Sequence, residues 1–224
     1  MSDAVLGPGP HTRVRRLPEK ARYDEVTVHA ILDEARFCTL AGMVDGLAMA
    51  LPTLHAREGR TLYLHGSQSN ALMKSVLAAR RGSLAVTIYD GLRLARSGFE
   101  SSIAYRSVVV VGEVSRIDDE LEQARVLDLF VDAILPGRAR EVRPTSDQEQ
   151  RLTMVLALAI DEASAKVSAG PTEDSDEDMA LPIWSGVVPA RLEFSAPIAS
   201  RDGAMASTSV ELPDSVRRLL GERA

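Results

Sequence analysis

The residues best suited to chemistry lie between positions 66 and 74. Ser67, Ser69 and Asn70 offer two hydroxyls and an amide within four residues, and Lys74 follows one helical turn later. The backbone N–H groups at the start of a helix lack partners, and the helix dipole favours negative charge there. This stretch therefore predicts a site for an anion. The alternative is that Ser69 or Asn70 only caps the helix and that Lys74 is solvated.

A strand and a helix must flank this polar stretch to position it. Leu62 and Leu64 alternate with Tyr63 and His65, which is the period-two pattern of a half-buried strand. From residue 71 to about residue 81, apolar residues recur at helical spacing among good helix formers. The sequence thus predicts a strand, a polar turn and a helix in that order.

A histidine with a second possible role lies just before this unit. Thr53 and His55 share one face of a predicted strand, Leu54 lies on the other, and Pro52 precedes them. Because proline removes a ladder hydrogen bond, this strand lies at an edge, contains a bulge or lines a ligand site. We interpret His55 as a core or rim residue, with ligand contact as the alternative.

The sequence offers no clear metal site. Residues 173–178 hold five acids in six positions, but they lack the glycine and the spaced ligands of a calcium loop. We interpret them as a solvated loop, with a divalent-cation site as the alternative. Zinc-type Cys/His spacing, a Walker loop, a GxGxxG fingerprint and a Ser/His/Asp nucleophile elbow are all absent from the sequence.

Composition indicates a single domain without a nucleic-acid or membrane partner. The 224 residues carry a formal net charge of −6, which gives no electrostatic footprint for anionic partners. The single cysteine, Cys38, cannot form an internal disulfide, and no apolar run approaches a membrane span. We therefore expect a cytoplasmic protein.

The remaining pattern predicts an antiparallel sheet. Asp45-Gly46 and Asp90-Gly91 each separate two short apolar runs, as the turn of a β-hairpin does. Most predicted strands pair in hairpins, so we expect a mainly β fold with helices, in which the sheet closes into a small barrel. The predicted strands cover residues 37–44, 47–56, 60–66, 84–89, 92–97, 105–117, 155–160, 163–168 and 186–196. The predicted helices cover residues 24–35, 71–81, 118–135, 146–154 and 213–222.

Three segments follow from this pattern. Residues 1–20 are rich in glycine, proline and arginine and are predicted to form an extended arm. Residues 21–202 are predicted to form the barrel domain. Residues 203–224 are predicted to form a polar tail.

Several motifs together resemble the pyridoxamine 5′-phosphate oxidase-like FMN-binding split barrels, in their flavin-nucleotide-binding branch. They follow one another from the arm to the last predicted strand. They are residues 13–18 (RVRRLP), 52–57 (PTLHAR), 62–67 (LYLHGS), 105–112 (YRSVVVVG), 162–166 (EASAK) and 184–189 (WSGVVP).

This resemblance implies an FMN held at a homodimer interface, with its phosphate at the strand-to-helix junction. It implies that Thr53 and Leu54 run beside the isoalloxazine, that His65 and Ser67 lie near the ring or ribityl chain, and that Ser69 and Asn70 meet the phosphate. Trp184 would approach the ring, either from the same subunit or, as an alternative, from the partner subunit. Relatives commonly carry a basic residue where Asn70 stands, so Lys74, Arg80 or Arg106 would supply the missing cation.

The resemblance implies flavin chemistry, because a bound flavin performs the redox step itself. We expect an FMN-dependent oxidoreductase acting on a small molecule, of reductase or nitroreductase type, with His65 as the candidate functional histidine. The alternative is a flavin- or haem-binding carrier or sensor without turnover. For haem, His55, His65 or Tyr105 could supply an axial ligand.

Overall fold

One antiparallel sheet dominates the computed structural model, which describes residues 5–198 and 211–221. Its ten strands are β1 (Ala21–Arg22), β2 (Cys38–Val44), β3 (Leu47–Thr53), β4 (Ala56–Glu58), β5 (Thr61–Ser67), β6 (Arg81–Leu94), β7 (Ser102–Arg116), β8 (Thr153–Ala159), β9 (Glu162–Ser168) and β10 (Gly186–Pro189). The main path runs β3-β2-β6-β7-β8-β5-β4, with β9 on β7, β1 on β9 and β10 on β6. This arrangement confirms the predicted split β-barrel fold.

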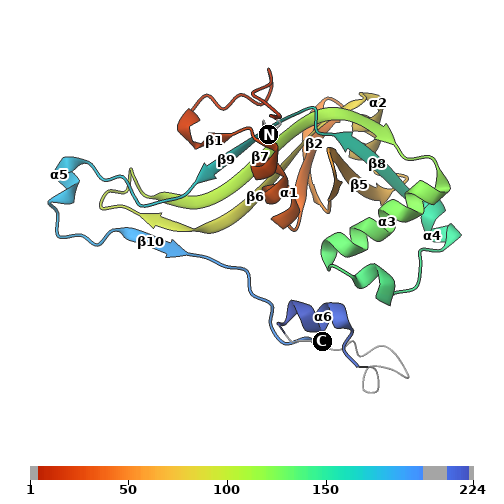
Figure 1. The fold of residues 1–224 in the computed structure, drawn as a ribbon. Helices are drawn as coiled ribbons and strands as arrows, with labels where there is room; N and C mark the ends of the chain where they lie inside the picture. The colour runs from red at the N-terminus through yellow and green to blue at the C-terminus, as the bar shows by residue number, and fades with distance from the viewer. Residues whose placement is uncertain (1–4, 199–210, 222–224) are drawn as a thin grey trace.

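The long strands β6 and β7 connect the two halves of the sheet. β7 pairs with β6 along one edge, and with β9 and then β8 along the other. Beyond the barrel, β6 and β7 continue as a ribbon toward α5 and β10, at the left of Figure 1.

The helices are α1 (Glu25–Glu34), α2 (Ala71–Ala78), α3 (Glu120–Ile134), α4 (Asp147–Leu152), α5 (Asp176–Met179) and α6 (Asp214–Leu219), with 3-10 turns η1 (Pro18–Lys20) and η2 (Arg138–Glu141). The helices α1 to α5 begin at side-chain caps, whereas α6 begins after Pro213 without one. Asp24, Asn70 and Asp119 each accept a hydrogen bond from the third backbone N–H of the helix that follows. None of the described helices is long and apolar enough to cross a membrane.

The two faces of β5 belong to different hydrophobic clusters. Leu62 and Leu64 pack in the barrel core, together with α1 and α2. Tyr63, on the opposite face, packs with Val126 and Phe130 of α3. The alternation read from the sequence is therefore confirmed, and it places α3 over the outer face of β5 and β8 (Figure 1).

The two Asp-Gly pairs have different structures, and the second hairpin prediction is wrong. Asp45 and Gly46 both have positive φ, 49° and 79°, and join β2 to β3 as predicted. Asp90 and Gly91 instead lie inside the continuous strand β6, at a register shift. A Cβ on Gly91 would lie 2.2 Å from the carbonyl oxygen of Val188, so this glycine admits the close approach of β10.

Other boundaries differ because tertiary pairing ends or extends an element. The predicted strand over 186–196 pairs only over β10, because only these residues lie beside β6. The predicted helix over 146–154 ends at Leu152, where the chain enters β8. The N-terminal arm packs through the buried Leu6, while residues 1–4 and the predicted boundary at 202/203 lie outside the described residues.

Candidate functional site

Side-chain hydrogen bonds connect the polar turn between β5 and α2 to the start of β8. We call Ser67, Gln68, Ser69 and Asn70 the 67–70 turn. The side-chain nitrogen of Gln68 donates to the carbonyl oxygens of Thr153 at 3.0 Å and Arg151 at 3.3 Å. These bonds fix the turn against the start of β8.

The turn presents donors that the chain itself leaves free. Asn70 caps α2 by accepting from the Met73 N–H at 3.0 Å, as one of the two sequence interpretations expects. The N–H groups of Ala71 and Leu72 have no acceptor among residues 5–198 and 211–221. The hydroxyls of Ser67 and Ser69 lie 2.9 Å apart on the exposed side of the turn. The two hydroxyls bond to each other, so one of them remains free to donate. Two free N–H groups and one free hydroxyl donor thus lie near the positive end of a helix dipole.

Within residues 5–198 and 211–221, no cationic side chain is hydrogen-bonded to this group of donors. Lys74 is exposed and forms no ion pair within the described part of the chain. Arg80 pairs with Glu113 at 2.5 Å, on a neighbouring surface. An anion at the turn would therefore be bound mainly by neutral donors.

His65 lies on β5 just before the turn and packs against α3. Its ring centroid is 4.3 Å from that of Phe130, with the planes inclined at 63°. Burial lowers the pKa of His65 below its ordinary value, so the imidazole is neutral at pH 7. Its Nδ1 is buried without a hydrogen-bond partner in the described structure, which leaves it available to a ligand.

A cavity of about 940 Å³ opens next to Phe130. We call it the α3 pocket. Its walls come from the end of α1, the segment after β3, the C-terminal half of α3 and the C-terminal segment of the chain. The lining residues include Leu32, Ala35, Arg36, Leu54, His55, Leu129, Phe130, Ile134, Phe194, Arg218 and Leu219. Thr53, the last residue of β3, is half-buried directly before Leu54.

His55 has a free lone pair in this pocket wall. Its Nε2 lies 2.8 Å from the carbonyl oxygen of Leu32, which can only accept, so Nε2 carries the proton. Burial lowers the pKa of His55, and only 7% of the residue is exposed. In the neutral ring Nδ1 is then an acceptor, and it has no partner among the described residues. Such a nitrogen can bind a metal or a donor group.

Arg106 lies in a different place, in a cavity of about 630 Å³ that we call the Arg106 pocket. Its guanidinium contacts Asp90 at 2.8 Å and Glu34 on a second side. Hydrogen bonds to Asp90 and then to Glu34 raise the pKa of Arg106. Two carboxylates therefore offset its charge, and it does not reach the 67–70 turn within this chain.

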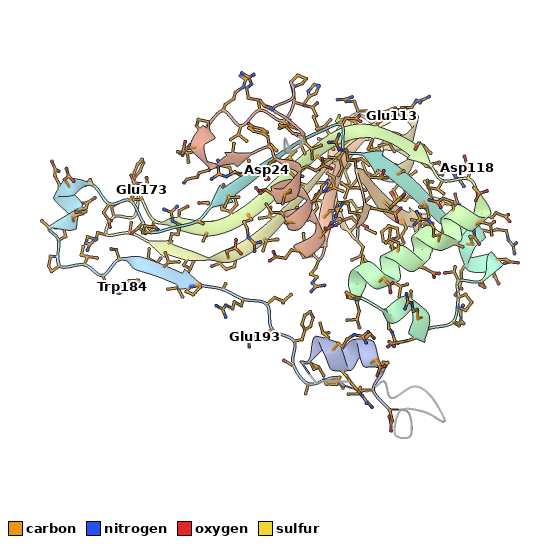
Figure 2. The ribbon with its side chains drawn as sticks, viewed as in Figure 1. Asp24, Glu113, Asp118, Glu173, Trp184 and Glu193 are labelled. Atoms are coloured by element: carbon orange, nitrogen blue, oxygen red, sulfur yellow. The ribbon has the colours of Figure 1, made fainter. Side chains whose placement is uncertain are left out.

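Trp184 and Tyr105 lie outside both groups. Trp184 is 65% exposed and lies beside the α5–β10 end of the molecule (Figure 2). Tyr105 on β7 is opposite Tyr89 and Ser168 and does not line the α3 pocket. The structure thus places His65, Ser67, Ser69, Asn70 and Lys74 along β5, the 67–70 turn and α2. Leu54 lines the α3 pocket, Arg106 lies in the Arg106 pocket, and Trp184 lies beside β10.

The α3 pocket could not be read from the sequence as a whole. Its walls join residues near position 32 to residues near position 218. His55 carried a weak signal, because a histidine after a strand proline points to a ligand site. Nothing in the local pattern indicates that α6 returns to the same place.

Solved structures and one protein family match this chain. Residues 24–167 match the family described as pyridoxamine 5′-phosphate oxidase. The flavocytochrome Anf3 from Azotobacter vinelandii is 36% identical with a TM-score of 0.87, over 94% of this chain and 97% of that one. The FAD and haem binding protein from Mycobacterium smegmatis is 34% identical with a TM-score of 0.83, over 89% and 97%.

A proposed 5-nitroimidazole antibiotic resistance protein from Bacteroides thetaiotaomicron shares the fold alone. It is 20% identical with a TM-score of 0.56, over 66% of this chain and 86% of that one. No curated protein sequence matches the chain.

Proposed function

The chain belongs to the pyridoxamine 5′-phosphate oxidase family, and from this premise we propose that it binds a flavin nucleotide as a redox cofactor. The observation that carries the proposal is that the N–H groups of Ala71 and Leu72 have no acceptor in the described structure and follow the exposed hydroxyl pair of Ser67 and Ser69. Two relatives above 30% identity are a flavocytochrome and an FAD and haem binding protein. The flavin phosphate would lie at the turn.

The residues of the chain would bind and orient the flavin. Ser69 and the N–H groups of Ala71 and Leu72 would donate to the phosphate, with Lys74 one turn away. Thr53, Leu54 and His65 would lie beside the ring, and the neutral His65 can donate to or accept from it through Nδ1. The flavin, when bound, supplies hydride or electron transfer.

We propose FMN as the flavin, with a small-molecule oxidoreductase activity in the cytoplasm. FMN and FAD share the ribityl phosphate that the turn would hold, and Ser67 and Ser69 are exposed, so the turn also leaves space for a longer nucleotide. Titration with FMN, FAD and riboflavin, followed by flavin fluorescence, tests both parts. Binding of riboflavin as tight as that of FMN would contradict a phosphate site at the turn.

We also propose that the protein is a homodimer whose flavin site includes Trp184 of the second copy. Within one chain Trp184 lies at the α5–β10 end, apart from α2 (Figures 1 and 2). The β6–β7 ribbon and β10 beside it expose apolar side chains such as Ile103, Val187 and Val188, which a second copy could cover. Trp184 is the single tryptophan, so its fluorescence should fall as FMN is added. A monomer in sedimentation that retains flavin would contradict the dimer.

Haem binding in the α3 pocket is the second candidate function. The pocket volume of about 940 Å³ falls within the range of cofactor sites, and its lining is mostly apolar. Of the three sequence candidates for an axial ligand, His55 is the one that lines this pocket, and its Nδ1 lone pair is free. A bound haem would supply electron transfer or oxygen chemistry.

An absorbance titration separates the two candidates. Haemin added to the FMN-loaded protein should give a Soret band while the two flavin bands persist, because the turn that would hold the phosphate does not line the pocket and only Leu54 borders both proposed sites. Displacement of FMN by haemin would assign the α3 pocket to the flavin ring. Absence of a Soret band would remove the haem function.

A further inference from the structure

The C-terminal segment forms one wall of the α3 pocket. Leu192 and Phe194, which follow β10, line it. Three residues of α6 also line it: Ser215, Arg218 and Leu219. Figure 1 shows α6 below the barrel, beneath the end of α3. These residues therefore belong to the pocket and not to a solvated tail.

A carboxylate holds α6 in place. Glu141, at the end of η2, accepts hydrogen bonds from both the backbone N–H of Ser215, at 2.9 Å, and its hydroxyl. These hydrogen bonds lower the pKa of Glu141, so the carboxylate is charged and the bonds are charge-assisted. Ser215 is only 1% exposed. The start of α6 is thus fixed to η2, one turn before Arg218.

The guanidinium of Arg218 lies at the pocket wall, against the loop that follows α3. Its Nη2 lies against Pro136 and Gly137, where a Cβ on Gly137 would come within 2.7 Å of it. Gly137 has a φ of 88°, a conformation that glycine adopts without strain. No carboxylate lies within 4 Å of Arg218 in the described structure, whereas the adjacent Arg217 pairs with Glu211 at 3.0 Å.

A second cation borders the same pocket. The Cζ of Arg36, which follows α1, lies 5.7 Å from the ring centroid of Phe194 and has no carboxylate partner among the described residues. Two arginines with no carboxylate within 4 Å in the described structure thus border a mostly apolar cavity, whose lining also includes Asp33, paired with Arg57, and Asp132. This combination suits a flat apolar ligand with acidic side arms, because guanidinium groups bind carboxylates by paired hydrogen bonds.

We propose that Arg218 is a specificity-determining residue of the α3 pocket, which binds a carboxylate arm of a planar ligand and is positioned for this by Glu141. The inference rests on the proposed haem function and assigns to α6 the recognition of the haem carboxylates. The C-terminal helix therefore selects the ligand as well as closing the pocket.

Haemin titration followed by the Soret band tests this with a matched pair of variants. Arg218→Gln should weaken haemin binding about tenfold, and Arg218→Lys should weaken it less, because lysine keeps the charge without the paired donors. Arg217→Gln, on the same helix, should bind haemin as the wild type does. With haemin dimethyl ester, which lacks the charges, wild type and Arg218→Gln should bind alike.

The outcomes separate this inference from the proposed function. Equal haemin binding by wild type and Arg218→Gln would overturn the role of Arg218 and leave the haem site in place. Equal weakening by Arg217→Gln and Arg218→Gln would also overturn it, because only a general effect on α6 would remain. Failure of the wild type to bind haemin would overturn both.

Discussion

The 67–70 turn and Arg106 are both predicted from the sequence as contacts for a phosphate. They differ in whether their polar groups already have partners within the chain. We call Arg106 with Asp90 and Glu34 the Arg106 cluster. Arg106 carries a full charge, but Asp90 and Glu34 offset it, and the cluster has a net charge of about −1. The turn carries no charge, yet the N–H groups of Ala71 and Leu72 have no acceptor in the described structure, and one hydroxyl of the Ser67–Ser69 pair remains free to donate. A site for an anion is thus indicated by unsatisfied donors rather than by the presence of a cation.

Asn70→Asp should produce the largest change if the phosphate lies at the turn. Aspartate caps a helix as well as asparagine does, so α2 should keep its stability. A carboxylate next to a phosphate is repelled by about 4 kcal/mol at 4 Å near a protein surface. We expect FMN binding to weaken at least roughly hundredfold, as measured by flavin fluorescence.

Asn70→Ser is the control for this substitution, because it keeps a neutral cap. It should bind FMN nearly as the wild type does. Riboflavin should bind to all three proteins alike, and a parallel loss of riboflavin would show that the ring, not the phosphate, lies near Asn70.

Ser69→Ala should have an intermediate effect. A hydrogen bond to a charged group contributes roughly 1.5–3 kcal/mol, so FMN binding should weaken about tenfold or more. Riboflavin, which lacks the phosphate, is the internal control. Equal weakening of both ligands would reduce the turn to a capped helix start.

Arg106→Gln should have the smallest effect on the flavin. Because its charge is already offset by Asp90 and Glu34, FMN affinity should change less than about twofold, while the free energy of unfolding falls by about 1 kcal/mol in a urea titration. A selective tenfold loss of FMN would reverse the comparison and place the phosphate at Arg106.

The Arg106–Asp90 ion pair also shows why a local sequence pattern can predict one element correctly and another wrongly. The strand, turn and helix around Ser69 are local, and alternation, polar turn and helical spacing predict them all. The two Asp-Gly pairs have the same local signal, but Arg106 binds Asp90 from the neighbouring strand and β10 approaches Gly91, so β6 continues. Those partners lie about 16 and 100 positions away, beyond any local pattern.

The site was predictable to the same extent. His65, Ser67, Ser69, Asn70 and Lys74 follow one another along β5, the turn and α2, so their proximity is local and readable from the sequence. The α3 pocket needs Leu32, His55, Phe130 and Arg218 together, and only the tertiary fold brings them to one cavity. The neutral state of His65 depends on its burial against Phe130, which no spacing in the sequence indicates.

The most direct test of the central claim is the ratio of the dissociation constants of riboflavin and FMN for the wild-type protein, measured by fluorescence titration at one salt concentration. If the 67–70 turn binds the phosphate through free N–H groups and hydroxyls, FMN should bind at least about tenfold more tightly than riboflavin. A ratio near one, or binding of neither ligand, would contradict the account.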